Sequence, residues 1–286
     1  MTGQVVEALA PRPGKVIIDC TLGEGGHAAG LLPLIQPGGL LFGLDRDREV
    51  LETARRKLAG YGDSVRVEHS NYTDLRGVLD RAGLEAADGV LFDLGVNSAQ
   101  LDSQERGFSF LRDGPLDMRM DRETGQTAAD LVNTLNRGEL EWIIRTYGEE
   151  RFARRISRRL VAERSKNPIR TTGRLAEIVA RTVPGRSRIH PATRTFQALR
   201  LAVNEELENL QRALPVALEV LRPGGRICLI AFHSLEDRIV KHTFRRWAGE
   251  GTARILTGKP VRPAAEEVRA NPRSRSARLR AAERLN

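Results

Sequence analysis

The sequence predicts an α/β protein with a mostly parallel sheet and an inserted helical domain. Short apolar runs alternate with helix-like stretches up to about residue 100. From about 101 to 195 only helical periods occur, and a strand-like run returns at 226–232. Strands that alternate with helices indicate a parallel sheet joined by right-handed crossovers. A length of 286 residues suits one large domain or two ordinary ones.

Four apolar runs in the first third of the chain are interpreted as buried strands. They cover 16–20, 39–45, 65–68 and 89–93, and the helical stretches between them cover 28–34, 49–58 and 75–82. The runs are continuous rather than alternating in hydropathy, which indicates strands buried on both faces. The run at 226–232 follows a turn at 223–225 and has the same character.

The middle third is predicted to be helical. Apolar residues recur there at helical spacing, and a Pro-Gly pair at 184–185 closes one helix. A long amphipathic helix with a single apolar stripe is predicted over 196–214. We therefore expect a discontinuous first domain of residues 1–103 and 196–286, and an inserted second domain of residues 104–195.

Positive charge is concentrated in two segments. The chain has 46 Lys or Arg and 37 acids, a net charge of +9. Residues 151–200 hold fourteen of the basic residues and two acids, and 269–286 hold six Arg and one Glu. A focused positive field attracts polyanions and releases their counterions. The first segment is therefore predicted to contact nucleic acid, with a solubilising surface as the alternative. The second is either a disordered tail or one that orders on nucleic acid.

Membrane, secreted and metal-binding classes are not indicated. No apolar run approaches the roughly 18 residues of a membrane span, and the N-terminus lacks the features of a signal peptide. Cys20 and Cys228 lie in strand-like runs and are expected to be buried, reduced thiols. No zinc-ligand spacing occurs, so we expect no metal. These features predict a cytoplasmic protein.

Glycines and acids follow the predicted strands. The first strand ends at Asp19 and leads into a glycine-rich turn at 21–27. Glycines at 23, 25 and 26 let the backbone approach a ligand closely. The second strand ends at Asp45, a carboxylate that can accept both hydroxyls of a ribose. Because ligands of open parallel sheets bind outside the carboxyl ends of the strands, these residues predict a nucleoside site.

The same edge receives residues from the third and fourth strands. Tyr72 follows the third strand and offers a ring for stacking on adenine, and the fourth strand ends at Asp93. The glycine spacing is not G-x-G-x-x-G, and Glu24 suits a sulfonium or an α-amino group better than two phosphates. The pattern favours S-adenosylmethionine over a dinucleotide. Helix capping or solvation is the alternative role for Asp45 and Asp93.

The chain closely resembles the ribosomal small-subunit RNA cytosine-N4 methyltransferases, the RsmH or MraW family. The resemblance covers nearly the whole chain in order and includes two long, unusual motifs, HPATRTFQALR (190–200) and FHSLEDRIVK (232–241). The other matching segments are DCTLGEGGH (19–27), GLDRD (43–47), DLGVNSAQLD (93–102), ERGFSF (105–110), GPLDMRM (114–120), TYGEERFARRI (146–156), NEELE (204–208), LRPGGR (221–226) and NPRSRS (271–276).

The resemblance implies a Rossmann-like class I methyltransferase that uses S-adenosylmethionine and carries an inserted helical, basic RNA-recognition domain. It implies methylation of N4 of a cytosine at the decoding site of 16S rRNA, with the small ribosomal subunit particle as the expected partner. The cofactor contacts that it implies are Gly25, Gly26, His27, Asp45, Tyr72, Asp93 and Gln100. Asp93 is also the candidate for orienting the reacting amine.

Three features depart from the family pattern. Tyr72 stands where Phe is frequent, and Asn97 and Ala99 replace the usual Ser and Pro of the DLGVSSPQ stretch. The Asn97 change falls near the expected target base. The segment between Trp247 and Asn271 is short for the family.

The residues expected to contact the RNA substrate are Asn97, Arg119, Arg194 and His233. Arg200 is also expected to be free for phosphate. The helix that follows residue 191 is expected to be capped by Thr193 or Thr195. A capping box with Ser234 as N-cap and Asp237 at N3 is predicted near His233.

Two other functions are compatible with parts of the sequence. One is a non-catalytic RNA-binding factor for ribosome assembly that retains the fold, for which an intact cofactor loop would be unnecessary. The other is a nicotinamide-dependent oxidoreductase, against which Glu24 and the glycine spacing argue. A cytosine ring-carbon methyltransferase needs a nucleophilic cysteine, and neither Cys20 nor Cys228 fits that role.

Overall fold

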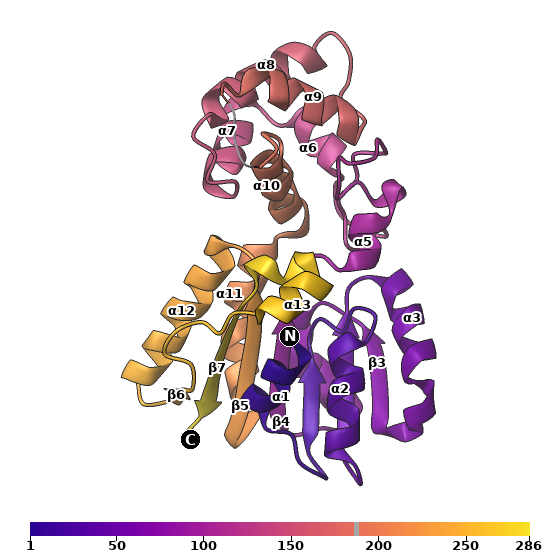
Figure 1. The fold of residues 1–286 in the computed structure, drawn as a ribbon, viewed down its shortest axis with the longest axis vertical. Helices are drawn as coiled ribbons and strands as arrows, with labels where there is room; N and C mark the ends of the chain where they lie inside the picture. The colour runs from indigo at the N-terminus through magenta and orange to yellow at the C-terminus, as the bar shows by residue number, and fades with distance from the viewer. Residues whose placement is uncertain (186–188) are drawn as a thin grey trace. The chain divides into compact units, whose positions relative to one another are not determined.

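The computed structural model describes residues 1–185 and 189–286 (Figure 1). The chain forms two compact units, Met1–Gly95 with Leu207–Asn286, and Val96–Glu206. The expected boundaries at 103/104 and 195/196 therefore shift. Residues 96–103 and 196–206 belong to the second unit, because Phe196 and Leu199 are buried in the apolar core of that unit.

The first unit is built on a seven-stranded sheet of order β3-β2-β1-β4-β5-β7-β6. The first five strands in this order are parallel, and β7 runs antiparallel to both β5 and β6. The prediction of a mostly parallel sheet is confirmed. The strands are β1 (Val16–Asp19), β2 (Leu40–Asp45), β3 (Val65–His69), β4 (Ala87–Asp93), β5 (Leu221–Ala231), β6 (Ala253–Ile255) and β7 (Arg278–Arg284).

Helices cover both faces of this sheet, as Figure 1 shows. Consecutive strand residues point to opposite faces, so Ile17 and Ile18 of β1 enter different apolar cores. This two-sided burial explains the continuous apolar runs. One core contains α1 (Thr2–Leu9), α2 (Gly26–Ile35) and α3 (Arg48–Leu58), and the other contains α4 (Leu75–Ala82), α11 (Glu206–Glu219) and α12 (Ser234–Gly249). Shorter pieces are η1 (Ala59–Ser64), η2 (Tyr72–Asp74), α13 (Ala265–Ala270) and η4 (Pro272–Ser276).

The second unit contains helices and no β-strand among its described residues. A separate apolar core, which includes Met118, Ile144 and Leu160, holds it together. Capping boxes at Thr127 and Asn136 fix the starts of two of its helices. Its helices are α5 (Ser98–Asp102), η3 (Gln104–Arg106), α6 (Ala128–Thr134), α7 (Arg137–Thr146), α8 (Ala153–Arg164), α9 (Thr172–Thr182) and α10 (Thr193–Asn204).

The prediction of a single long helix over 196–214 is wrong. The α10 helix ends at Asn204, Glu205 adopts a left-handed conformation with φ of 49°, and α11 begins at Glu206. The apolar stripe is continuous in sequence, but its first half is buried in the core of the second unit and its second half in the first unit.

The two helix caps were also predicted at the wrong positions. The N-cap of α10 is Ala192, without a side-chain cap, rather than Thr193 or Thr195. The capping box of α12 lies one residue earlier than expected, with His233 as N-cap and its partner Glu236 at N3. Asp237 instead pairs with Arg280, at 2.6 Å between carboxylate and guanidinium.

The remaining expectations concern the tail and the cysteines. The basic C-terminal segment is not a disordered tail, because its end forms β7, which pairs with β5 and buries Leu279 and Ala281. Cys20 and Cys228 are both buried and free, as predicted. Among the described residues, no helix is both long and apolar enough to cross a membrane. Within residues 1–185 and 189–286, no group of three or more His, Cys, Asp or Glu side chains is arranged so that it could hold a metal ion.

Candidate active site

Three aspartates end neighbouring strands of the first unit. Asp19, Asp45 and Asp93 are the last residues of β1, β2 and β4. The β1 strand lies between β2 and β4, and the connections leave it in opposite directions, so this edge is the topological switch point of the sheet. His27, in the first turn of α2, places Nε2 3.4 Å from Asp93 Oδ2. The structure therefore gathers four ionisable side chains where ligands of such sheets bind.

The glycine-rich turn is shaped by this cluster. Gly25 is the N-cap of α2 with φ of 76°, a conformation that favours glycine, and a Cβ there would press on Leu58 Cδ1 at 3.1 Å. A Cβ on Gly26, by contrast, would have no neighbour within 4 Å. The Gly23 N–H donates to Asp45 Oδ2 at 2.8 Å, which ties the turn to the second strand. The turn thus leaves open space beside Gly26.

Asp45 is held by backbone donors on both oxygens. Oδ2 accepts from Gly23 and Oδ1 from the Asp47 N–H at 2.9 Å. Burial raises the pKa of Asp45 to about 6, although these backbone hydrogen bonds act in the opposite direction. Each carboxylate oxygen has a second lone pair, so Asp45 retains capacity to accept ribose hydroxyls.

Asp19 was not predicted as a site residue, although its position at the end of the first strand was the available signal. Its side chain is almost completely buried. Burial raises the pKa of Asp19 to about 7; His27 and the Thr21 N–H lower it, and the charges of Asp93 and Asp45 raise it. The site therefore concentrates negative charge beyond what the sequence analysis assigned to it.

His27 and Thr21 organise Asp93. Burial lowers the pKa of His27, but its hydrogen bond to Asp93 and the charges of Asp93 and Asp19 raise it above its ordinary value. The Thr21 hydroxyl accepts the Asp93 N–H at 2.6 Å, which fixes the backbone at the end of β4. Thr21 was likewise not named from the sequence. It lies two residues after Asp19, at the start of the glycine-rich turn.

Two buried polar atoms of the cluster lack protein partners. Among the described residues, neither His27 Nδ1 nor Asp93 Oδ1 has a hydrogen-bond partner. Unsatisfied buried groups are costly, so they indicate a ligand that satisfies them. The sulfonium, ammonium and hydroxyl groups of S-adenosylmethionine match an anionic cluster beside an open glycine turn. Two phosphates would face three carboxylates, which disfavours a dinucleotide.

The other expected cofactor residues fall in different surroundings. Tyr72 opens η2 directly after β3 and packs edge-on against Phe92, with ring centroids 5.4 Å apart. Gln100 is buried in the second unit, where it and Asn97 form the capping box of α5. Their contacts to the cofactor and the substrate stay predictions. The cap does explain the departure at position 97, since Asn and Ser are equally good N-cap residues.

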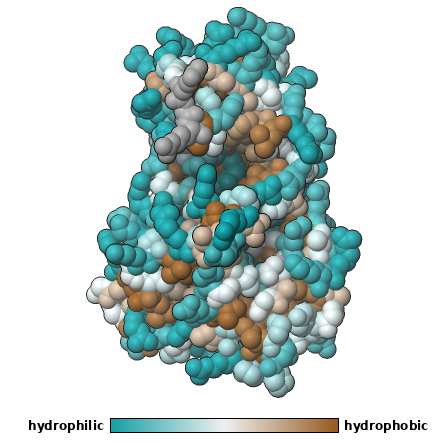
Figure 2. Space-filling model, viewed as in Figure 1, coloured by the Kyte–Doolittle hydropathy of each residue, from teal (hydrophilic) through white to brown (hydrophobic). Residues whose placement is uncertain are grey.

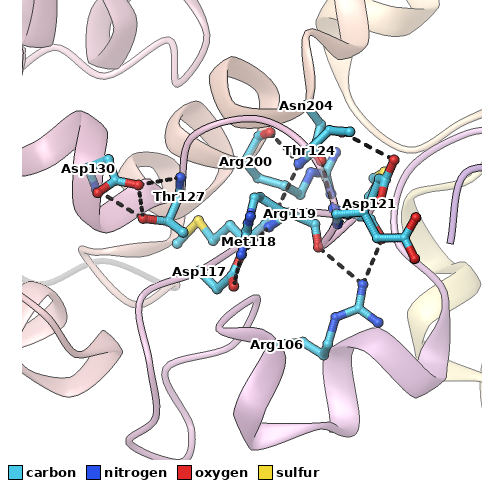
Figure 3. A network of polar contacts seen from close by, with 12 residues as sticks. Arg106, Asp117, Met118, Arg119, Asp121, Thr124, Thr127, Asp130, Arg200 and Asn204 are labelled. Atoms are coloured by element: carbon cyan, nitrogen blue, oxygen red, sulfur yellow. Dashed lines mark hydrogen bonds and ion pairs between the residues drawn. The ribbon is translucent and has the colours of Figure 1, made fainter. Parts of the chain in front are cut away.

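Arg119 is the most firmly held of the expected RNA contacts (Figure 3). Its guanidinium donates to both oxygens of Asp117, at 2.8 and 3.0 Å. The intervening Met118 has a left-handed φ of 64°, an uncommon conformation for this residue type. The Asn204 amide bridges the segment, donating to Met118 O and accepting from the Met120 N–H, each at 2.8 Å. The buried Arg106 donates to the carbonyls of Arg119 and Met120.

The structure does not group all the expected RNA contacts in one unit. Arg119, Arg194 and Asn97 lie in the second unit, whereas His233 caps α12 in the first. Arg194 is about half exposed and donates to Glu149 O at 3.2 Å. The expectation that Arg200 is free for phosphate is wrong, because it is largely buried and pairs with Glu206 at 2.9 Å.

A mostly parallel sheet with an open glycine turn and carboxylates at its switch point defines an S-adenosylmethionine-dependent methyltransferase. The comparisons with known proteins agree with this class. The chain belongs to the MraW methylase family, whose model matches residues 1–285.

Relatives of similar length share about half of its residues. The ribosomal RNA small subunit methyltransferase H of Pelobacter propionicus is 52% identical, over 100% of this chain and 97% of the relative. The protein of the same name from Symbiobacterium thermophilum is also 52% identical, over 99% of this chain and 94% of the relative. The crystal structure of a candidate rRNA methylase from Clostridium thermocellum shares the fold, with a TM-score of 0.50 at 13% identity, covering 99% of this chain and 96% of that one.

Proposed function

We propose that this methyltransferase transfers a methyl group from S-adenosylmethionine to N4 of a cytosine at the decoding site of 16S rRNA. Membership of the MraW methylase family and the names of its relatives support a small-subunit rRNA substrate. The observation that carries the chemistry is the buried, unpartnered Oδ1 of Asp93 at the switch point, beside His27. A small ribosomal subunit particle in the cytoplasm is the proposed setting.

The difficulty of the reaction lies in the nucleophile. The lone pair of the cytosine amine is delocalised into the ring, so an acceptor on its N–H is needed to make the nitrogen reactive. Bound S-adenosylmethionine supplies a methyl carbon on a positively charged sulfur, which keeps the C–S electron pair as the N4–C bond forms. The rate then depends mainly on positioning of the two reactants, which is worth roughly 7–11 kcal/mol in well-oriented pairs.

Asp93 is the residue proposed to orient the amine. Its Oδ1 accepts an N–H of N4, and the same carboxylate is positioned to hold the proton that N4 loses after methyl transfer. His27, 3.4 Å from Oδ2, fixes the other oxygen and balances its charge. Asp19 has a pKa of about 7, so near neutral pH it is partly protonated and adds less negative charge to the cluster.

The remaining expected residues divide between the two ligands. Gly25, Gly26, Asp45 and Tyr72 are proposed to bind the cofactor, together with Gln100 from the second unit. Asn97, Arg119, Arg194 and His233 are proposed to bind the RNA. A non-catalytic assembly factor is not favoured, because the glycine turn and the acidic cluster are intact.

The test is mass mapping of modified cytosines in small-subunit RNA. Naked RNA and purified small subunits are incubated with the protein and methyl-labelled S-adenosylmethionine, alongside the Asp93→Ala variant. The expected result is one N4-methylated cytosine at the decoding site, present with wild type and absent with the variant. Label at another base, or no transfer to either RNA form, would refute the proposal.

A further inference from the structure

The exposed side of α8 carries three arginines that form one face. Arg154, Arg155 and Arg158 are exposed, and at about 100° per residue they fall within an arc of ~100° around the helix. The opposite side packs into the core of the second unit through Ala153, Ile156, Ser157, Leu160 and Glu163. We call the three residues the α8 arginine face. The rim of this unit over α8, which Figure 1 labels, is predominantly hydrophilic in Figure 2.

This face is not neutralised by carboxylates. Within residues 1–185 and 189–286, no Asp or Glu lies within 4.0 Å of the guanidinium nitrogens of Arg154, Arg155 or Arg158. By contrast, the exposed Arg145 of the same unit pairs with Glu141 at 2.7 Å. The single acid of α8, Glu163, is buried and already pairs with Arg159, Lys166 and Arg174.

The position of these charges opposes helix stability. Arg154 and Arg155 lie in the first turn of α8, which contains no acid, so they face the positive end of the helix dipole. Arg154 and Arg158 are like charges four residues apart, which is also unfavourable. The neighbouring helices α6 and α7 follow the usual preference, with Asp130 and Glu139 in their first turns. A bound polyanion would reverse the sign of both effects on α8.

Arg151 adds a further exposed guanidinium just before the helix begins. Its guanidinium lies over the ring of Phe152, 4.6 Å from the ring centroid, and the residue is exposed. Stacking uses the flat face of a guanidinium and leaves the in-plane N–H donors available, the arrangement suited to phosphate oxygens. The stack also limits the motion of this side chain before any ligand binds.

We propose that the α8 arginine face binds the phosphodiester backbone of the RNA substrate without reading its sequence. The inference rests on the proposed function and adds to it the surface that supplies sequence-independent affinity. Guanidinium groups on phosphates give binding that weakens steeply with salt, because each contact releases condensed counterions. Phosphate contacts position an RNA but carry no base information, so α8 contributes to KM and leaves kcat unchanged.

The test compares two triple variants of equal charge. Arg154→Ala, Arg155→Ala and Arg158→Ala are combined in one. The control combines Arg55→Ala, Arg145→Ala and Arg246→Ala, three exposed arginines that pair with an acid three or four residues away in the chain, Glu52, Glu141 and Glu250 respectively. Affinity is measured by fluorescence anisotropy at several salt concentrations, for a decoding-site RNA and for an unrelated hairpin of equal length. Circular dichroism and thermal melting confirm that each variant is folded.

The α8 variant is expected to bind both RNAs roughly 10- to 100-fold more weakly at low salt, with the slope of log K against log salt reduced by about 3. The control is expected to keep the wild-type slope within about one unit. Replacement of the same three residues by Lys is expected to restore most of the slope. With the methyl-transfer assay, KM rises in the α8 variant and kcat does not change.

Three outcomes would overturn the inference while the proposed function stands. One is a wild-type slope in the α8 variant, and another is equal slope losses in the α8 variant and the control. A loss confined to the decoding-site RNA would also refute it, since the face would then read sequence. Failure of the proposed function has a different signature, namely that the wild-type protein methylates no small-subunit cytosine.

Discussion

The two units of the protein differ in where their charged side chains lie and in what they contact. In the first unit three carboxylates and one imidazole are gathered at a sheet edge, where the pKa values of Asp19, Asp45 and His27 are raised. In the second unit the arginines remain charged and differ in whether a carboxylate holds them, as with Arg119 and Asp117, or none does, as on α8. Burial sets the pKa values of the acids in the first unit, whereas the arginines of the second unit differ in whether they form ion pairs. The two units should therefore respond to different perturbations, pH in the first case and salt in the second.

The largest expected effect is on the pH dependence of stability, through Asp19. Its pKa is about 7 in the folded chain against an ordinary value of 3.8, so its protonated form stabilises the fold. That stability is fully present below pH 3.8 and is lost as the pH rises through 7, a change of roughly 4 kcal/mol. Asn cannot ionise and can still accept the Thr21 N–H. Asp19→Asn is therefore expected to gain stability over wild type as the pH rises.

Urea unfolding of the ligand-free protein at pH 5 and pH 8 measures this gain. The difference between variant and wild type removes the contribution of carboxylates remote from Asp19, such as Asp88 and Asp237, whose pKa values are lowered by ion pairs in both proteins. What remains comes from Asp19 and the charges coupled to it. A variant-minus-wild-type difference that is the same at both pH values would show that Asp19 ionises normally.

The next largest effect is on methyl transfer, through Asp93. Removal of one charged group that stabilises a reacting centre typically lowers kcat by about 10²–10³-fold. Asp93→Ala is expected to show a loss of this size in single-turnover methylation, with RNA affinity unchanged. Asp93→Asn keeps an acceptor oxygen but loses the charge, so it should retain more activity than Ala. Equal losses in the two variants would argue that Asp93 is structural.

A smaller effect is expected on the stability of the second unit, through Asn204. This buried amide satisfies the Met120 N–H and the Met118 carbonyl, and it holds the left-handed Met118 in place. Asn204→Ala leaves both backbone groups without a partner and should lower the free energy of unfolding by about 2–3 kcal/mol. Asp130→Ala, which removes an exposed capping-box partner in α6, is the control and should cost about 1 kcal/mol. Comparable losses of unfolding free energy in the two variants would mean that the hydrogen bonds of Asn204 stabilise the unit no more than an exposed helix cap does.

The features that could be predicted from the sequence lie mainly in the first unit. The five parallel strands could be predicted from the sequence, because burial on both faces requires a continuous apolar run in each of them. The acids at strand ends were accessible for the same reason, since parallel strands bring their carboxyl ends to one edge. Asp19 was at such an end but was not assigned, because its burial depends on residues far apart in the chain.

Errors arose where a pattern is ambiguous between two environments. An apolar stripe at helical spacing does not reveal that its halves enter different cores, so the break at Glu205 was missed. Adjacent residues compete to cap a helix, which is why His233 rather than Ser234 takes that position. Whether an arginine is free depends on a carboxylate brought near by folding. Arg200 pairs with Glu206 across the helix break, and the local sequence pattern does not predict this ion pair.

The smallest expected effect separates the two ligands directly. Arg194→Ala removes one exposed guanidinium and should weaken RNA binding by about 10-fold and lower the salt slope by about 1, with cofactor affinity unchanged. Asp45→Ala is the mirror variant and should weaken S-adenosylmethionine binding by roughly 10- to 100-fold, because it removes a charged acceptor, and leave the RNA slope as it is. Calorimetry with the cofactor and anisotropy with RNA at several salt concentrations measure both. If each variant impaired both ligands to the same extent, buried acids and exposed arginines would not serve separate ligands, and the division between the two units would fail.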